Sequence, residues 1–380
     1  MKQEQNLTQG NVMKTLLVFT VPFIIANLIQ ALYGAVDLFV IGRYCSPESV
    51  AAVSTGTQVT QIITSMITGL TLGSTILVGK YTGMNARDEV RKTIGTTLSV
   101  FALVAIALTA LMLLFVTPIL ELLKTPAPSF ALAKQYVVIC SCGIFFICGY
   151  NAISAILRGY GDSKRPMMFI ALSCALNVAG DVILVKYAGL GVAGVALATI
   201  GSQAISMFCA IVYLNRSRFI FTFSLANLRV DGDKVRELAA VGIPISLQEC
   251  MVRLSFLYLT SVTNRLGVYA AAAVGIASKY DVFAMLPATS TANALAAVTA
   301  QNYGAGKPER ARESLFAGLG FAVAASALFW LWAQLSPQTM IGMFTGDGNI
   351  IREGIPFFKS CSYDYLAVSF VFCLNGYLNG

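Results

Sequence analysis

Histidine is absent from this 380-residue sequence, which removes the side chain that proteins use most often as a general base and as a zinc ligand. Charge is also scarce, since only 12% of the residues are Asp, Glu, Lys or Arg, about half the share typical of a soluble domain. These two shortages argue against a hydrolase, a metalloenzyme or a soluble protein. We therefore expect no enzymatic activity and no cofactor.

Other patterns are missing as well. The nine cysteines follow no metal-ligand spacing and mostly lie within apolar runs, so no structural metal is expected. No series of segments alternates strictly between polar and apolar residues over about ten positions, which argues against a transmembrane β-barrel. The polar start, MKQEQNLTQGN, is not typical of a cleavable signal peptide.

Apolar residues, in contrast, make up 57% of the sequence. They gather in runs of about 20 or more, the length that crosses roughly 30 Å of hydrocarbon as a helix. Ten spans are predicted, at 13–42, 50–80, 94–120, 132–157, 166–187, 192–214, 238–264, 269–300, 314–334 and 355–378. The sequence thus predicts an all-α integral membrane protein whose surroundings are the lipid bilayer.

Positive charge is distributed unevenly between the predicted loops. If the N-terminus lies inside, 17 of the 26 Lys and Arg residues fall on the inner side, 6 on the outer side and the other 3 within spans. Positively charged loops stay in the cytoplasm, so we expect a cytoplasmic N-terminus in a bacterial cytoplasmic membrane. This topology explains the net charge of +8, and no nucleic-acid partner is implied.

The two halves of the sequence resemble each other at a constant shift of 221 residues. The matches place Ala51-Ala52-Val53 on Ala272-Ala273-Val274, Gly83 on Gly304, Arg91 on Arg312, and Leu157 and Gly159 on Leu378 and Gly380. Chance similarity between apolar helices is the alternative, but loop residues match too. A repeat unit of six spans is even, so both halves of the protein enter the membrane from the same side. The halves should therefore be related by an axis along the membrane normal, which is a transporter architecture.

The repeat also predicts the domain organisation. We expect a first six-helix lobe at 1–214, a cytoplasmic inter-lobe loop at 215–236 and a second lobe at 237–380. At the shift of 221, the second lobe stops where the first still has two spans to come. The intact protein is therefore expected to have twelve spans and to reach at least about residue 435, the counterpart of Leu214.

Two polar residues lie near the middle of the fifth span. A charge in hydrocarbon costs from about 3 kcal/mol upward, so a carboxylate there needs a partner or a proton. Asn177 and Asp181 are four residues apart and lie on the same face of a helix. This pair can therefore offer two oxygen ligands to a single site.

The first span carries a polar face of its own. Asn27, Gln30, Tyr33 and Asp37 fall within an arc of roughly 120° on a helix. The alternative for the uncharged residues is ordinary hydrogen bonding between membrane helices. Pro22 in this span, and Pro244 in the seventh, are expected hinges, since proline frees backbone groups and bends a helix.

Several polar residues share one depth in the predicted topology. The outer half of the membrane contains Asp37, Tyr136, Asp181 and Thr199, each on a different span. We therefore expect these residues to meet in one pocket.

Three segments resemble the MATE multidrug and toxic compound extrusion transporters, especially their DinF-like and MepA-like bacterial branch. They are VPFIIANLIQALYGAVDLFVIGRYCS, LRGYGDSKRP and the arrangement from NVAGD to Thr199. The resemblance implies two six-helix lobes around a central cavity, and export of organic cations driven by inward flow of H⁺ or Na⁺. It also implies that the cation-coupling residues, and a possible Na⁺ site, are Asp37, Asn177, Asp181 and Thr199, with Tyr136 nearby.

The second half contributes further charged residues to the spans. Asp37, Asp181, Glu249, Asp281 and Asp364 outnumber Arg253 and Lys279 by five to two, which favours cationic cargo. The position of Glu249 resembles that of a carboxylate that some family members use, although Arg253 one turn later could neutralise it. The candidates for the substrate cavity are Gln30, Tyr33, Asn151, Glu249, Arg253, Lys279, Asp281 and Asp364.

The favoured function is thus secondary active export of small lipophilic organic cations by a monomer. One alternative is a lipid-linked saccharide flippase of the same superfamily, whose cavity should be cationic rather than acidic. The other is a membrane protein that transports nothing, which leaves the repeat and the Asn177–Asp181 pair unexplained. Oxygen ligands serve H⁺ and Na⁺ alike, so the coupling ion stays open.

Overall fold

The computed structural model describes residues 6–217, 219–224, 227–264 and 268–380, and the described residues form helices and loops with no strand. The N-terminal bundle contains α1 (Val12–Tyr44), α2 (Pro47–Gly83), α3 (Arg87–Leu122), α4 (Ala127–Cys142), α5 (Ile144–Gly159), α6 (Lys164–Asp181), its π-helical continuation η1 (Val182–Tyr187) and α7 (Gly191–Arg216). The C-terminal bundle contains α8 (Gly232–Asn264), α9 (Val268–Gly304), α10 (Pro308–Leu335), α11 (Pro337–Gly342) and α12 (Gly348–Asn379).

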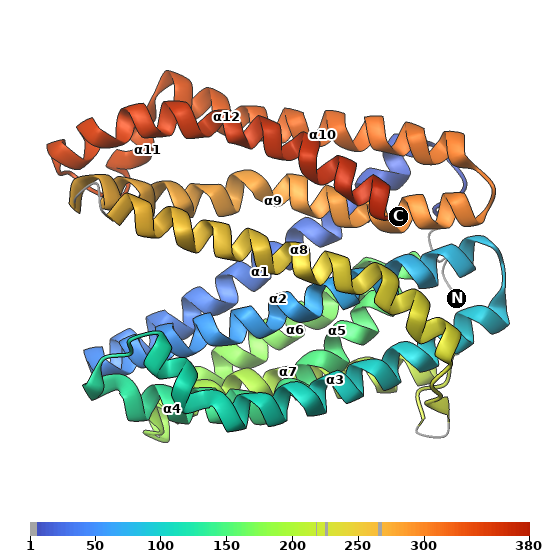
Figure 1. The fold of residues 1–380 in the computed structure, drawn as a ribbon, viewed down its shortest axis with the longest axis horizontal. Coiled ribbons are helices and arrows are strands. Elements are labelled where there is room, and N and C mark those ends of the chain that lie inside the picture. The colour runs from blue at the N-terminus through green and yellow to red at the C-terminus, as the bar shows by residue number, and fades with distance from the viewer. Residues whose placement is uncertain (1–5, 218, 225–226, 265–267) are drawn as a thin grey trace.

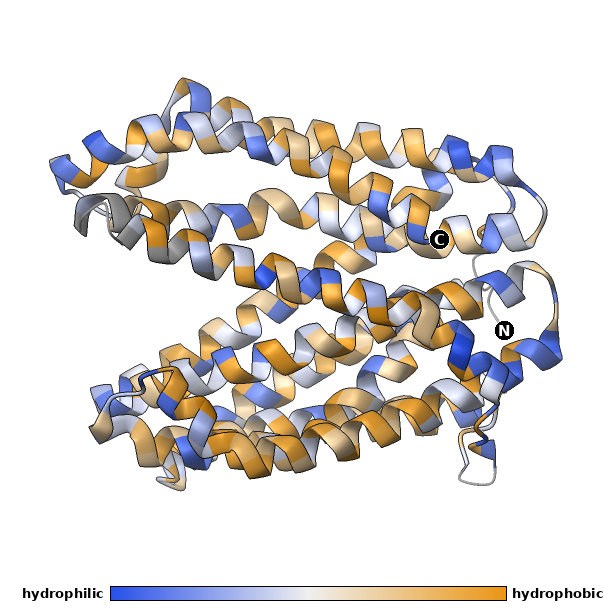
Figure 2. Cartoon of the chain, viewed as in Figure 1, coloured by the Kyte–Doolittle hydropathy of each residue, from blue (hydrophilic) through white to orange (hydrophobic). Residues whose placement is uncertain are grey.

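The helices of the structure agree in length and composition with the ten predicted spans. Nine described helices are long and apolar enough to cross a membrane by themselves, counting α6 and η1 together. The tenth span is the pair α4 and α5, which is bent by 48° at Gly143. A side chain at Gly143 would collide with Ile200 of α7, so the close approach of α7 explains the glycine at this bend. The hydropathy colouring shows apolar residues along the middle of the helices and polar residues at both ends (Figure 2).

The helices form two groups that are visible as separate layers in Figure 1. In the N-terminal bundle α2 packs on α4 and α5, and α6 packs on α1 and α7. In the C-terminal bundle α9, α10 and α12 pack on one another. The all-α architecture in two bundles agrees with the fold class expected from the sequence.

The first helix of each bundle packs partly on the other bundle. Leu16, Phe19 and Phe23 of α1 belong to a core cluster with α9, α10 and α12, whereas Val40 and Ile41 belong to the core of the N-terminal bundle. In the same way α8 packs its early residues on α2, where the Ser246 hydroxyl donates a 2.8 Å hydrogen bond to the carbonyl oxygen of Met66. The expected hinge prolines, Pro22 and Pro244, lie near these crossings inside continuous helices.

The bundles meet at the end of the molecule that carries both chain termini (Figure 1). There Gln301 of α9 donates a 2.7 Å hydrogen bond from Nε2 to the carbonyl oxygen of Gly159 on α5. The loops α2–α3 and α9–α10 lie at this same end, which we call the basic end because it carries most of the predicted inner-side Lys and Arg residues. Toward the opposite end the ribbons of the two bundles diverge.

Candidate functional site

A cluster of buried polar side chains lies inside the N-terminal bundle, where α1, α6 and α7 meet. The side chains are Asp37 of α1, Asn177 and Asp181 of α6, and the half-buried Thr199 of α7. Asp37 is 4% exposed and the α6 residues are fully buried. The Thr199 hydroxyl donates a long hydrogen bond of 3.5 Å to Asp37 Oδ2, and the side chains of Asn177 and Asp181 are also neighbours of this carboxyl group. The structure thus brings together four residues that the sequence assigned to one site.

A chain of hydroxyl groups supports this cluster. Tyr33 of α1 donates a 3.2 Å hydrogen bond to the backbone oxygen of Thr199 and lies 2.9 Å from Ser202 Oγ. Ser202 is in turn 3.4 Å from Ser173 Oγ of α6. Sequence reasoning missed both serines, although Ser173 precedes Asn177 by one helical turn and therefore shares the face that carries Asp181.

The polar atoms of the cluster are poorly paired. Among the described residues, no hydrogen-bond partner meets either oxygen of Asp181, Asp37 Oδ1, or the side-chain oxygen and nitrogen of Asn177. A buried polar atom without a partner costs about 1–3 kcal/mol, and an ionised carboxylate costs more. The free oxygens therefore form a suitable cradle for a proton or a small hard cation.

The backbone changes at this site as well. α6 ends at Asp181, and the wider π-helical turn of η1 begins with the next residue. Short π-helical segments are rare and often occur at functional sites. The sequence predicted a regular helix over 166–187, so this change of helix type is a finding of the structure.

The donor set of the cluster suits light, oxygen-loving cations. Within the part of the chain that the structure describes, no group of three or more His, Cys, Asp or Glu side chains could hold a metal ion. The available ligands are two carboxylates with neutral amide and hydroxyl oxygens, which fit H⁺ or Na⁺. Tyr136 of α4 is buried within electrostatic reach of Asp37, but its hydroxyl group lies 3.4 Å from Thr57 Oγ1 of α2.

The other candidates on the N-terminal bundle do not join the cluster. Asn27 donates a 3.0 Å hydrogen bond to Ser290 of α9 and so connects the two bundles. Gln30 is exposed. Asn151 is half-buried and donates a 2.8 Å bond to the Ile147 carbonyl one turn earlier in its own helix. The predicted polar face of the first span is therefore divided between three environments. Asn27 lies between the bundles, Gln30 is exposed, and Tyr33 and Asp37 lie at the polar cluster.

The candidates on the C-terminal bundle fall into three environments. Asp281 of α9 lies beside Tyr365 of α12 and within electrostatic reach of the exposed Asp364 of the same helix. Glu249 is half-buried on α8 beside the exposed Arg253, one turn away. Lys279 is exposed on α9.

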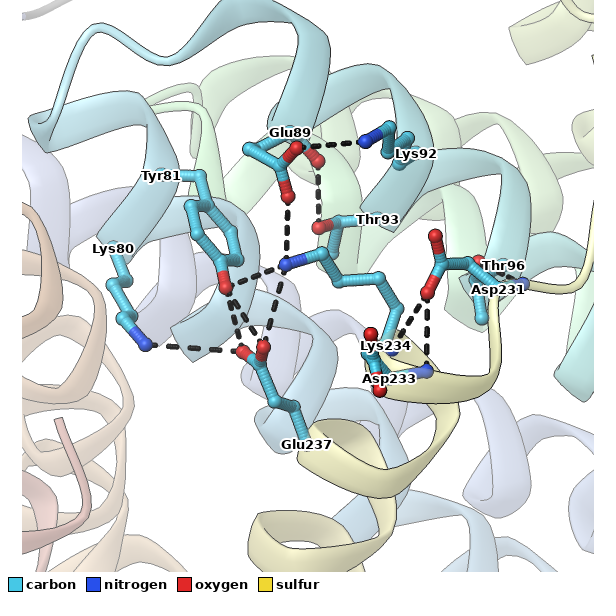
Figure 3. A network of polar contacts seen from close by, with 10 residues as sticks. All are labelled: Lys80, Tyr81, Glu89, Lys92, Thr93, Thr96, Asp231, Asp233, Lys234 and Glu237. Carbon is cyan, nitrogen blue, oxygen red and sulfur yellow. Dashed lines mark hydrogen bonds and ion pairs between the residues drawn. The ribbon is translucent and has the colours of Figure 1, made fainter.

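A second polar cluster, which sequence reasoning missed, joins the bundles at the basic end (Figure 3). Lys234 of α8 was expected to be a loop charge, but α8 begins at Gly232 and Lys234 is only 6% exposed. Its Nζ lies 2.6 Å from Tyr81 Oη of α2, 2.9 Å from Glu89 Oε2 of α3 and 3.3 Å from Glu237 Oε1. Tyr81 also donates to Glu237. We call Lys234, Tyr81, Glu89 and Glu237 the inter-bundle cluster; the only sequence signal for it was the density of charge at 229–237.

The sequence and the fold both match known proteins. The MatE family model matches residues 22–183 and 244–380. The probable multidrug resistance protein YpnP of Bacillus subtilis (strain 168) is 27% identical over 374 residues, covering 98% of this chain and 83% of that protein. The multidrug export protein MepA of Staphylococcus aureus (strain NCTC 8325 / PS 47) is 23% identical over 361 residues, covering 93% of this chain and 78% of that protein.

Solved structures share the fold. A multidrug resistance MATE family transporter of the MOP superfamily, solved in an outward-facing conformation, superposes with a TM-score of 0.91 at 22% identity. The match covers 100% of this chain and 85% of that one.

Proposed function

This chain belongs to the MatE family, and on that premise we propose that it is a multidrug exporter that moves small lipophilic organic cations out of the cell in exchange for H⁺ or Na⁺. It is a multi-pass membrane protein, and the proposal places it in a bacterial cytoplasmic membrane with a cytoplasmic N-terminus. The basic end of the molecule then faces the cytoplasm. We propose that it works as a monomer with two lobes.

The observation that carries the proposal is the unpaired oxygen cluster around Asp37 and Asp181. Two carboxyl groups that are buried side by side cannot both stay ionised without a counter-ion, because desolvation and mutual repulsion both oppose the charge. A proton or a Na⁺ ion bound between them, with Asn177 and Thr199 as neutral ligands, removes that cost. We expect this site to bind the coupling ion in one state of the transport cycle and to release it in another.

The path of α1 connects this site to the arrangement of the bundles. Asp37 lies in the half of α1 that packs inside the N-terminal bundle, whereas Leu16 and Phe19 lie in the half that packs on the C-terminal bundle. Pro22 lies near the crossing and lacks the amide hydrogen that would rigidify the helix there. Neutralising Asp37 and Asp181 can thus change how the two halves of α1 are oriented, and with them the bundles.

The charge inside the spans supports a cationic cargo. Asp281 lies within electrostatic reach of Asp364 on the C-terminal bundle, and the spans contain the acidic residues Asp37, Asp181, Glu249, Asp281 and Asp364 against the basic residues Arg253, Lys279 and Lys359. A flat lipophilic cation gains both from this negative potential and from contact with aromatic rings. A lipid-linked saccharide carries pyrophosphate and would require the opposite charge.

Reconstitution into liposomes tests the proposal. Purified protein is exposed to a fluorescent organic cation under an imposed pH gradient in one arm and a Na⁺ gradient in the other. We expect dye to move against the ion in only one arm, which identifies the coupling ion, and to stop when an ionophore collapses the gradient. Dye movement that is indifferent to both gradients would overturn the proposed coupling.

A further inference from the structure

A pocket of about 560 Å³ lies at the basic end, between the first turns of α3 and residues 220–222 and 227–231 of the segment that connects α7 to α8. Its lining includes Arg91, Lys92 and Thr96 of α3 and Asn227, Arg229 and Asp231 of the connecting segment. This pocket is separate from the buried oxygen cluster. Three cationic side chains and one carboxylate line it, so its net charge is positive.

The single carboxylate of the pocket is already used by the fold. Asp231 Oδ1 accepts hydrogen bonds from the backbone N–H groups of Asp233 at 3.1 Å and Lys234 at 3.2 Å. This is the geometry of a helix cap, and the carboxylate neutralises part of the positive end of α8. Asp231 therefore opposes an anionic ligand less than a free carboxylate would.

The arginines keep most of their donors. Arg91 uses Nε to donate a 3.0 Å hydrogen bond to the Ile220 carbonyl, which holds the connecting segment against α3. The nearest carboxylate of Arg91, Asp88, is 3.9 Å away and 89% exposed, so this ion pair is weak. Arg229 is exposed, and no ion pair is formed by it with the described residues. Two guanidinium groups with free N–H donors suit the planar, bidentate recognition of a phosphate.

The wall of the pocket is tightly packed. Gly95 of α3 lies so near the Asn227 carbonyl that a side chain there would meet it at 2.8 Å. The Thr96 hydroxyl accepts a 3.2 Å hydrogen bond from the backbone N–H of Asp231, which leaves its own proton free for a ligand. The wall thus adds a buried donor to the two arginines.

The depth of the pocket fits the head-group region of a membrane. On α3 the large exposed apolar side chains begin with Leu103 and Ile106, which are 59% and 63% exposed. Leu103 lies seven residues beyond Thr96, about 10 Å along the helix. The pocket therefore begins about two helical turns outside the lipid-facing surface, where basic pockets on the cytoplasmic side bind lipid phosphates.

We propose that this pocket binds a phosphate-bearing anion, with the head group of an anionic phospholipid as its source. The phosphate lies between Arg91 and Arg229 and accepts from Thr96. Because Asp231 caps α8, and because Lys92 is 2.9 Å from Glu89 of the inter-bundle cluster, the bound anion stabilises the junction of α3 and α8. The proposal rests on the proposed orientation, not on export.

Lipid binding to the purified chain in detergent tests this site. Native mass spectrometry and thermal unfolding are compared after addition of phosphatidylglycerol, phosphatidylcholine or inorganic phosphate. The double variant Arg91→Gln/Arg229→Gln removes the proposed donors. Its matched control, Arg87→Gln/Arg236→Gln, removes two exposed arginines at the same end without touching the pocket and leaves the same net charge.

We expect phosphatidylglycerol to bind the wild type and the control alike, and to bind the pocket variant about tenfold more weakly, a loss of about 1.4 kcal/mol. If only inorganic phosphate stabilises the wild type, and the pocket variant loses this effect, the pocket binds an anion but its ligand is a soluble phosphate and not a lipid head group. Equal weakening of lipid binding in both double variants would show that general surface charge attracts the lipid, and would overturn the proposed site. No transport is measured, so failure here leaves the export proposal untouched.

Discussion

Gly83 of α2 and Gly304 of α9 form a reciprocal contact between the two bundles. A side chain at Gly83 would collide with the backbone oxygen of Gln301, and a side chain at Gly304 would collide with that of Lys80. The shift of 221 residues that relates the sequence halves converts Gly83 into Gly304 and Lys80 into Gln301. The contact therefore maps onto itself, as expected where two repeats meet at a shared axis. Small residues allow the helices to approach this closely.

Substitution of these glycines should separate the bundles at the basic end. Gly83→Ala or Gly304→Ala places a methyl group against immovable backbone, so we expect each to lower the free energy of unfolding by about 1–3 kcal/mol. Thermal unfolding in detergent measures the effect. Gly275→Ala is the control in the same helix as Gly304, because a methyl group there meets nothing within 4 Å and should be neutral or stabilising. Equal stability of all three variants would show that the contact is loose.

Removing either buried carboxylate should abolish coupling without harming the fold. Asp37→Asn and Asp181→Asn keep the side-chain shape and eliminate a poorly paired charge, so unfolding should be unchanged or shifted upward. Dye export under an ion gradient should fall to the level of empty vesicles. The double variant should be no worse than either single one, because the residues act as a unit. Asp88→Asn, which removes an exposed carboxylate, should export normally; wild-type export by both site variants would reduce the cluster to a structural role.

The inter-bundle cluster should contribute to stability through Lys234. Lys234→Met leaves Glu89 and Glu237 facing each other without their shared cation, and we expect a loss of about 1–3 kcal/mol, moderated because both glutamates are a third exposed. Adding Glu237→Gln should recover part of that loss, which a double-mutant cycle of unfolding free energies measures. The neighbouring exposed Arg236→Met should change stability little. Additive effects of Lys234→Met and Glu237→Gln would argue against direct pairing.

Restoring the missing hydrogen bond of α1 should slow transport more than it affects folding. Pro22→Ala stiffens the helix near the point where it crosses between bundles, so we expect stability to hold and export to slow by about tenfold, or about 1.4 kcal/mol in the barrier. Initial rates of dye export at matched protein amounts measure this. Pro118→Ala in α3, a helix whose buried residues near that position pack within the N-terminal bundle, is the control. A similar slowing in both variants would remove the special role of Pro22.

The sequence by itself determined the features that depend on local patterns. The lengths of the apolar runs predicted ten spans, because the thickness of a bilayer sets the length of a crossing helix. The spacing of Asn177 and Asp181 placed them on one face, because a helix repeats every 3.6 residues. The constant shift predicted that Gly83 and Gly304 are equivalent, which their reciprocal contact bears out.

Only the tertiary structure decided which helix faces which. Asn27 and Asp37 share a polar face in sequence, yet Asn27 pairs with Ser290 of the other bundle while Asp37 joins α6 and α7. The sequence predicted Lys234 as a loop charge, but in the structure it is buried among side chains from α2 and α3. Such outcomes depend on contacts between residues more than 100 positions apart. Helical periodicity says which residues share a face, but the neighbour of that face is set by how all the helices pack together.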